Sequence, residues 1–218
     1  MKYNKTVKAK FLSRPNRFIA KVEIDGREET VHVKNTGRCK ELLIEGVDVI
    51  LCEGESLSRK TKYDLIGVYK KDLGLVNIDS QAPNKVAFEW LKTRDYDYIK
   101  PEYTIGNSRI DFYMEKGNEK YLLEVKGCTL EVDGVGYFPD APTERGVKHL
   151  RELAALQSEG YSCAVAFVIQ MEGIYEVRPN VATHKEFGVA LDEAKAAGVK
   201  ILFLPCALTE NTLEILQN

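Results

Sequence analysis

Two acidic residues and a lysine interrupt a stretch that otherwise has the pattern of a β-hairpin. The segment SRIDFYMEKGNEKYLLEVKGCTL spans residues 108–130 and carries Asp111, Glu124 and Lys126. If RIDFYM and YLLEVK pair as antiparallel strands around a turn at Gly117–Asn118, the numbers of paired residues sum to 235, and Asp111 lies opposite Glu124. Because strand side chains alternate, these two carboxylates and Lys126 share one face of the hairpin. The apolar face then comprises Ile110, Phe112, Leu123 and Val125.

The chemistry of such a polar face is that of a divalent cation site. Carboxylates directly opposite each other have Cβ atoms about 4.5 to 5.5 Å apart and repel each other. A cation between Asp111 and Glu124 relieves this repulsion, and oxygen ligands without histidine or thiolate favour Mg²⁺ or Mn²⁺ over zinc. With Lys126 beside them, these residue types meet the needs of phosphodiester hydrolysis, which are charge neutralisation and a nucleophilic water. The alternative is an ordinary hairpin whose polar face is solvated and carries surface ion pairs.

The first eighty residues, which must position part of any such site, have the pattern of short strands. FIAKVEI and ETVHVK flank the turn dipeptide Asp25–Gly26, and VDVILC, YDLIGVY and LGLVNI follow. Between them, GRCKELLIEG at 37–46 predicts a short helix that ends at Gly46. Five strands with one inserted helix are typical of an OB-like β-barrel. We therefore predict an OB-like domain over residues 1–82.

The remaining residues, 83–218, alternate between helical and strand patterns. NKVAFEWLKTRD predicts a helix before the hairpin, and TERGVKHLRELAALQSEG predicts an amphipathic helix after it. CAVAFVI, HKEFGVALDEAKAAG and KILFLPC then alternate strand, helix and strand, which predicts parallel pairing in a buried sheet. The expected fold class is thus α+β or α/β, with a barrel followed by an α/β domain that has a mixed central sheet.

Composition limits the classes of function. The chain has 218 residues, 44% of them hydrophobic, and its 31 basic and 33 acidic residues give a net charge of −2. No global positive field therefore indicates a nucleic-acid or membrane partner, and a basic surface must be local. The five cysteines are scattered without Cys-x-x-Cys spacing, and neither a signal peptide nor a membrane-spanning run is present. We expect a cytoplasmic protein that is not bound to a membrane.

The order of these elements resembles a known superfamily. Asp111 followed by Glu124-Val125-Lys126, between helices, is similar to the core of the PD-(D/E)xK nucleases. More specifically, NTGRCKEL at 35–42, SRIDF at 108–112, EVKGCTL at 124–130 and GYFPDAPTERGVKHLREL at 136–153 resemble the sugar fermentation stimulation protein A family. This resemblance implies an OB-like domain, a nuclease-like domain and binding to DNA. It also implies a role in regulating sugar metabolism, notably that of maltose, so it does not by itself imply cleavage.

The resemblance also implies roles for individual residues. Asp111, Glu124 and the backbone carbonyl of Val125 would hold Mg²⁺ or Mn²⁺, Lys126 would orient or activate water, and Glu102 is a weaker candidate ligand. One departure is that Ile110 stands where the superfamily has proline before the first acid. Pro139–Asp140 comes after Glu-x-Lys, in the wrong order to serve, and is interpreted as a loop feature before the next helix.

Residues for DNA binding are expected in both domains. Seven basic residues and no acid lie between Met1 and Lys21, interleaved with Tyr3, Phe11 and Phe18 as possible stacking surfaces. The alternative is an edge strand protected by lysines, with Phe18 in the core. Thr143 is expected to cap the next helix, where i, i+4 spacing pairs Glu144 with Lys148 and Arg145 with His149. Arg145 or Lys148 could contact a phosphate near the metal. The alternative is charge pairing on the helix surface. The DNA-binding candidates are Arg14, Asn16, Arg17, His32, Asn35, Arg38, Arg145 and Lys148.

Three hypotheses follow for the function. The first is a DNA-binding protein of the sugar fermentation stimulation type with a Mg²⁺-dependent phosphodiesterase site. The second is a non-catalytic DNA-binding regulator of sugar metabolism genes that uses the same surface. The third, weaker hypothesis is that the carboxylate face binds a nucleotide or an RNA end. Strand preference, sequence preference and oligomeric state are not determined by these patterns.

Overall fold

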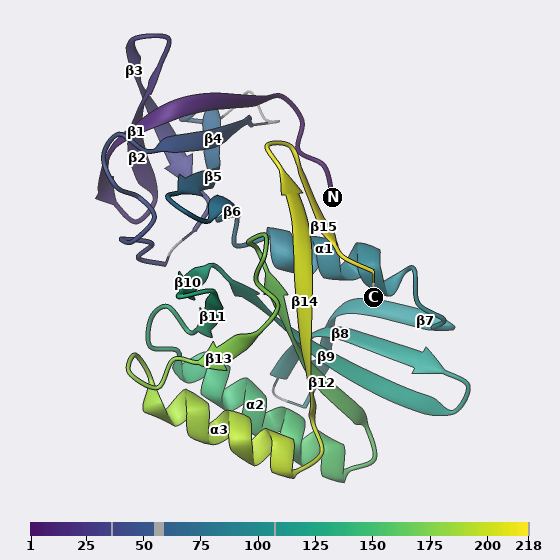
Figure 1. Cartoon of the computed structure of the whole chain (residues 1–218). Coiled ribbons are helices and arrows are strands. Elements are labelled where there is room, and N and C mark those ends of the chain that lie inside the picture. The colour runs from purple at the N-terminus through teal and green to yellow at the C-terminus, as the bar shows by residue number, and fades with distance from the viewer. Residues whose placement is uncertain (36, 55–58, 107, 218) are drawn as a thin grey trace.

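The computed structural model describes residues 1–35, 37–54, 59–106 and 108–217, and it consists of a β-barrel half and an α/β half packed together (Figure 1). Within the described residues, the barrel half is one sheet with strand order β3-β2-β1-β4-β5-β6. A parallel pairing of β3 with β5 closes β1 to β5 into a barrel, which confirms the predicted OB domain. The strands are β1 (Thr6–Asn16), β2 (Ile19–Ile24), β3 (Arg27–Val33), β4 (Asp48–Glu53), β5 (Tyr63–Lys70) and β6 (Gly74–Asn77).

Two expectations for the barrel are wrong. The N-terminal segment is not an edge strand, because β1 pairs with β2 on one side and with β4 on the other. The helix predicted over residues 37–46 is a series of turns. Cys39 has a φ of 45°, outside the helical range, and the N–H groups of Leu42 and Leu43 both donate to its carbonyl. Cys39 and Leu42 are buried, so core packing holds this connection in a non-helical conformation.

The α/β half is built on a mixed sheet with strand order β15-β14-β12-β9-β8-β7. β12 pairs with β14 in parallel, as predicted, and β9 also pairs with β12 in parallel, while β7, β8 and β9 pair antiparallel. The small sheet β10-β11-β13 lies beside it. The strands are β7 (Tyr98–Ile105), β8 (Ser108–Lys116), β9 (Glu119–Cys128), β10 (Leu130–Val132), β11 (Val135–Phe138), β12 (Ser162–Ile169), β13 (Val177–Pro179), β14 (Lys200–Thr209) and β15 (Thr212–Ile215).

Helices cover both faces of the mixed sheet. α1 (Ala82–Leu91) packs on one face, and α2 (Glu144–Ser158) and α3 (Lys185–Ala196) lie side by side on the other (Figure 1). α2 begins as predicted, because the Thr143 side chain accepts a hydrogen bond from the Gly146 N–H. None of the helices in the described part of the chain is long and apolar enough to cross a membrane.

The two halves share a hydrophobic core and a polar contact. Val76 and Ile78 of the barrel half belong to the same buried cluster as Ile169, the last residue of β12 in the α/β half. At this junction the side-chain amide of Gln170 donates to the Asn77 side-chain oxygen at 2.8 Å. The boundary predicted between residues 82 and 83 falls in the first turn of α1, and a short connection links β6 to this helix. The α/β half is therefore held in a defined position against the barrel.

Candidate functional site

The register of the β8–β9 hairpin is the predicted one, and its predicted apolar face is confirmed except at Ile110. The pairs from Phe112–Leu123 to Lys116–Glu119 all sum to 235. Phe112 and Leu123 pack under α1, whereas Ile110 belongs to the core cluster on the opposite side. Both sides of the hairpin are thus covered, because helices pack on both faces of the sheet. The alternative of a solvated polar face is wrong, since Glu124 is 2% exposed.

Asp111 lies on β8, one residue beyond the last pair of the β8–β9 ladder. One of its carboxylate oxygens accepts the Val125 backbone N–H at 2.7 Å, and the other accepts the Asn84 side-chain amide of α1, also at 2.7 Å. Burial raises the pKa of Asp111, and the charge of Glu124 raises it further, against the lowering effect of these two hydrogen bonds. The charge of Glu124 thus contributes to the raised pKa of Asp111, although the ladder itself ends at Phe112 and Leu123.

Glu124 on β9 has one satisfied and one unsatisfied carboxylate oxygen. Lys126 donates to Oε1 at 2.5 Å, and Nδ1 of His149 on α2 hydrogen-bonds to the same oxygen. Oε2 is buried and has no hydrogen-bond partner within the described residues. Burial is the largest influence on the pKa of Glu124 and raises it, but the contacts with His149 and Lys126 outweigh burial and lower it. Glu124 is therefore a charged side chain with one free oxygen in the protein interior.

His149 connects this carboxylate to the protein surface. Its Nε2 accepts a hydrogen bond from Nε of Arg145 at 3.3 Å, which leaves the ring proton on Nδ1 to be donated to Glu124. The predicted pair of Arg145 with His149 is confirmed. The predicted pair of Glu144 with Lys148 is wrong, because Glu144 contacts His184 and Lys148 contacts Glu152. No sequence pattern relates His149 to Glu124, since only the packing of α2 on the sheet brings them together.

The donor set fits a small divalent cation held by two carboxylates. The free Glu124 Oε2 and the neighbouring Asp111 carboxylate are hard oxygen donors, and Mg²⁺ is often held by one or two carboxylates together with water. The weaker candidate Glu102 lies on β7, where its exposed carboxylate pairs with Arg109 at 2.8 Å. In the described ranges, no group of three or more His, Cys, Asp or Glu side chains is arranged to hold a metal.

In the barrel, Arg14 organises the loops that carry several DNA-binding candidates. Its guanidinium donates to the backbone carbonyls of Arg17, Asn35, Gly37 and Arg38 at 2.7 to 2.9 Å. These contacts bring the β1–β2 turn next to the loop after β3. Arg14 is thus engaged with the protein itself, while Arg17 and Arg38 remain exposed.

Asn16, His32 and Asn35 are also engaged in local contacts. The Asn16 side chain accepts the N–H groups of Phe18 and Ile19, and the Asn35 side chain accepts that of Gly37 at 2.7 Å. His32 lies apart, where its Nδ1 contacts Asp64 at 2.9 Å. The barrel therefore places Arg17, Asn35 and Arg38 on one surface and His32 on another.

Among the described residues, four of the seven basic residues in the N-terminal stretch form ion pairs, three of them with acids that are distant in sequence. The ion pairs are Lys5–Glu53, Lys8–Glu210, Lys10–Asp48 and Lys21–Glu28. The expectation of stacking surfaces is wrong for Tyr3 and Phe11, which are buried. Phe18 is 50% exposed at the β1–β2 turn, with the Arg17 guanidinium 5.9 Å from its ring centre, so its expected place in the core is also wrong.

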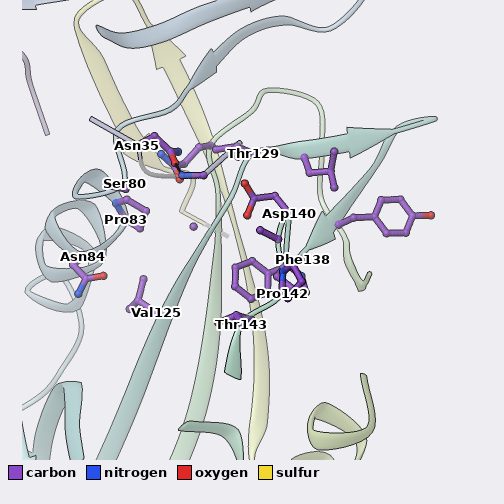
Figure 2. Close-up of a pocket in the computed structure, with 17 residues that line it drawn as sticks. Asn35, Ser80, Pro83, Asn84, Val125, Thr129, Phe138, Asp140, Pro142 and Thr143 are labelled. Atoms are coloured by element: carbon purple, nitrogen blue, oxygen red, sulfur yellow. Dashed lines mark hydrogen bonds between the residues drawn. The ribbon is translucent and has the colours of Figure 1, made fainter. Parts of the chain in front are cut away.

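A pocket of about 350 Å³ lies between the two halves (Figure 2). The barrel contributes Asn35 and Gly37, and the α/β half contributes Asn84 and Val125, which both hydrogen-bond to Asp111. Asp140 lines the pocket from the loop before α2, as Figure 2 shows. The sequence identified this residue as a loop feature, but nothing in its neighbours along the chain indicates a pocket.

Comparisons with known proteins agree along the whole chain. A family model for the SfsA N-terminal OB domain matches residues 12–78, and a model for the sugar fermentation stimulation protein RE domain matches residues 81–212. The chain is 58% identical over 217 residues to the sugar fermentation stimulation protein homolog of Desulfitobacterium hafniense strain Y51, covering 98% of this chain and 95% of the relative. The homolog of Clostridium beijerinckii is 54% identical over 219 residues, covering 99% and 96%.

A solved structure has the same fold. The structure of Pyrococcus furiosus SfsA in complex with Ca²⁺ superposes with a TM-score of 0.85 and 26% sequence identity, over 99% of this chain and 95% of that chain. Both halves and their arrangement are therefore shared with this relative.

Proposed function

Because the chain belongs to the sugar fermentation stimulation protein family, we propose that it binds DNA and hydrolyses phosphodiester bonds at a Mg²⁺- or Mn²⁺-dependent site. The residues of this site are Asp111, Glu124 and Lys126. The observation that carries the proposal is the buried, unpartnered oxygen of Glu124 near Asp111, a carboxyl whose pKa is raised by burial and then by the charge of Glu124. Asp111 is half-buried with two uncharged donors, and Glu124 is buried with one oxygen unsatisfied, so a cation between them would offset their repulsion.

The chain itself supplies hard ligands for the ion. Asp111 and Glu124 would hold it, and the family resemblance adds the backbone carbonyl of Val125. When bound, the ion supplies polarisation of a phosphoryl oxygen and lowers the pKa of water. The Ca²⁺ complex of the Pyrococcus furiosus relative supports this proposal, because Ca²⁺ and Mg²⁺ both prefer oxygen ligands.

The remaining polar residues act on charge and orientation. Lys126, whose Nζ lies 2.5 Å from Glu124 Oε1, carries a positive charge at the edge of the site. There it stabilises negative charge that develops on the phosphate, or orients the attacking water. His149 and Arg145 hold Glu124 by Oε1, so that Oε2 stays free for the ion.

Exposed cations in both halves would contact the DNA backbone. Arg17 and Arg38 lie on the barrel, and Arg145 and Lys148 lie on α2. Arginine and lysine contacts of this kind position the phosphates without reading sequence. We place the activity in the cytoplasm, because all five cysteines are free thiols, as a reducing compartment favours.

The alternative function is a non-catalytic DNA-binding regulator of sugar (maltose) metabolism genes. One observation favours it: among the residues described, the acids do not form a cluster of three or more metal ligands. A site with two carboxylates could bind an ion and a DNA phosphate without cleaving the strand.

The decisive experiment combines metal binding with cleavage. Mn²⁺ is titrated calorimetrically into wild type, Asp111→Asn and the control Glu102→Gln, and each protein is then incubated with plasmid and Mn²⁺, with or without chelator. We expect wild type and Glu102→Gln to bind Mn²⁺ and cut the plasmid, and Asp111→Asn to do neither. Cleavage that survives both Asp111→Asn and the chelator would refute the proposed site. Salt-sensitive DNA binding without cleavage by wild type would support the regulator instead.

A further inference from the structure

The pocket between the two halves adjoins the proposed catalytic site. Its floor includes Gly127 near the end of β9 and Gln170 just after β12, two neighbouring parallel strands. In open α/β sheets, ligands bind in the crevice at the carboxyl ends of parallel strands. Asn84 and Val125 line the pocket and also hydrogen-bond to Asp111. A ligand in the pocket would therefore be next to a phosphodiester at Asp111 and Glu124.

Asp140 is the charged group that faces this pocket. Figure 2 shows its carboxylate on the side opposite Pro83 and Asn84 of α1. The barrel loop approaches it closely, because a Cβ on Gly37 would lie 2.5 Å from Asp140 Oδ2. Within the described residues Asp140 forms no ion pair, and burial raises the pKa of its carboxyl. The carboxylate lies close to the barrel loop and keeps acceptor capacity for a ligand.

The character of the walls distinguishes between possible ligands. Pro83, Val125 and Pro142 give the pocket apolar surfaces that suit a flat ring. A carboxylate on the wall repels a phosphate but accepts hydrogen bonds from an amino group, as aspartate does with cytosine N4. The volume of about 350 Å³ is in the range of small-ligand sites.

We propose that this pocket takes one unpaired nucleobase that carries an exocyclic amino group, from the strand whose phosphate lies at Asp111 and Glu124. This inference rests on the proposed function and specifies its substrate as single-stranded or locally unpaired nucleic acid. Enzymes that act on individual nucleotides accept single strands or move the base out of the stack. Asp140 accepts the amino hydrogen, and the proline and valine side chains contact the base.

Fluorescence anisotropy with two oligonucleotides tests this assignment. The oligonucleotides are deoxycytidine and deoxyuridine oligomers of about 8 nucleotides, a length that suits one OB-type site. Their bases differ at C4, where cytosine has an amino group and uracil has a carbonyl. They are titrated with the full chain in Ca²⁺, and a gel checks that they stay intact. We expect wild type to bind the deoxycytidine oligomer about tenfold more tightly. Asp140→Asn should lose or reverse this ratio, because its amide can donate to the uracil carbonyl.

The control and the contrary outcomes separate this inference from the proposed function. Asp133→Asn, on the exposed turn between β10 and β11, should keep the wild-type ratio. Equal affinity of wild type for both oligomers, or an unchanged ratio in folded Asp140→Asn, would overturn the pocket assignment alone. The wild-type comparison holds even if the variant does not fold. Absence of salt-dependent binding to either oligomer would contradict the DNA-binding function itself.

Discussion

Asp64 in the barrel and Asp111 in the α/β half both lie on strands, but their surroundings shift their pKa values in opposite directions. Arg59 donates to both oxygens of Asp64, and His32 contacts it at 2.9 Å. Burial is the largest influence and raises the pKa of Asp64, but the contacts with Arg59 and His32 outweigh it and the pKa is lowered. Asp111 has two uncharged donors, and burial together with Glu124 raises its pKa.

We interpret this difference as one between a structural charge and the proposed functional one. The barrel pairs its buried carboxylate with Arg59, so that charge needs no ligand to offset it. The α/β half leaves Asp111 beside Glu124 with a free oxygen, and such perturbed groups are concentrated at functional sites. Variants of the two regions should therefore differ in what they lose, activity or stability.

The largest effect is expected at Lys126. Lys126→Gln should lower plasmid cleavage by about 10²- to 10⁴-fold, the contribution typical of a positioned catalytic side chain. It should retain Mn²⁺ binding, since both carboxylates remain. The matched control is Lys120→Gln, an exposed lysine on the same strand, which should cut at the wild-type rate. Equal rates in the two variants would exclude Lys126 from the reaction.

A smaller effect on metal affinity is expected at His149. His149→Ala removes a partner of Glu124 Oε1 and should weaken Mn²⁺ binding by about 10- to 100-fold, as residues that orient metal ligands typically do. His149→Gln, which keeps a donor, should recover part of the affinity. Calorimetric titration measures both, with the exposed Lys148→Ala as control. Affinity unchanged in His149→Ala would show that Glu124 does not depend on this contact.

Replacing the two aspartates should have different effects on the free energy of unfolding at pH 7. Asp64→Asn leaves Arg59 without its carboxylate and should lower the free energy of unfolding by about 1 to 3 kcal/mol. Asp111→Asn removes repulsion from Glu124 and should leave the free energy of unfolding unchanged or raise it. Urea denaturation followed by circular dichroism measures both values. A larger loss in Asp111→Asn than in Asp64→Asn would reverse the comparison.

The free energies of unfolding of these two variants, relative to wild type, should change with pH in opposite directions. The charge of Asp64 stabilises the fold above the ordinary Asp pKa of about 3.9, and this stabilisation is lost as pH falls through its lowered folded pKa. Ionisation of Asp111 destabilises the fold; this effect is absent below about 3.9 and grows as pH rises through its raised folded pKa. Urea titrations at several acidic pH values measure the free energy of unfolding of each variant relative to wild type. As pH falls, the loss in Asp64→Asn should shrink, and any gain in Asp111→Asn should shrink as well. A loss in Asp64→Asn that persists in strong acid would show that the charge of Asp64 does not stabilise the fold.

The smallest effect is expected from substitutions on the barrel surface, which should change the salt dependence of DNA binding. Arg17 forms no ion pair among the described residues, whereas Lys10 is 2.6 Å from Asp48. Arg17→Ala should reduce the slope of log affinity for DNA against log salt by about 1, the value for one lost phosphate contact. Lys10→Ala should change it less, because its charge is already paired. Anisotropy titrations over a range of salt concentrations decide between them.

Much of the fold could be predicted because the relevant patterns are local. The register of β8 with β9 follows from strand alternation and the turn at Gly117–Asn118, and the start of α2 follows from the cap at Thr143. The failure at residues 37–46 has the opposite cause. Burial of Cys39 and Leu42 against the barrel overrides the helical preference of that segment.

The candidate site could be predicted only where its residues lie on one hairpin. Asp111, Glu124 and Lys126 are related by strand pairing, which two neighbouring segments specify. The contacts of Glu124 with His149, of Asp111 with Asn84 and of Asp140 with the loop at Gly37 join segments that are far apart in the chain. No local periodicity encodes these contacts.

Residue types and their spacing along the chain thus determine the family, the barrel followed by the α/β half, and the pair of acids with its lysine. The tertiary structure determines that Glu124 is buried with one free oxygen, that most N-terminal lysines are paired with acids and that a pocket lies beside Asp111. The physical reason is that burial and electrostatic environment depend on every group nearby in space, whereas a sequence pattern reports only the neighbours along one strand or helix.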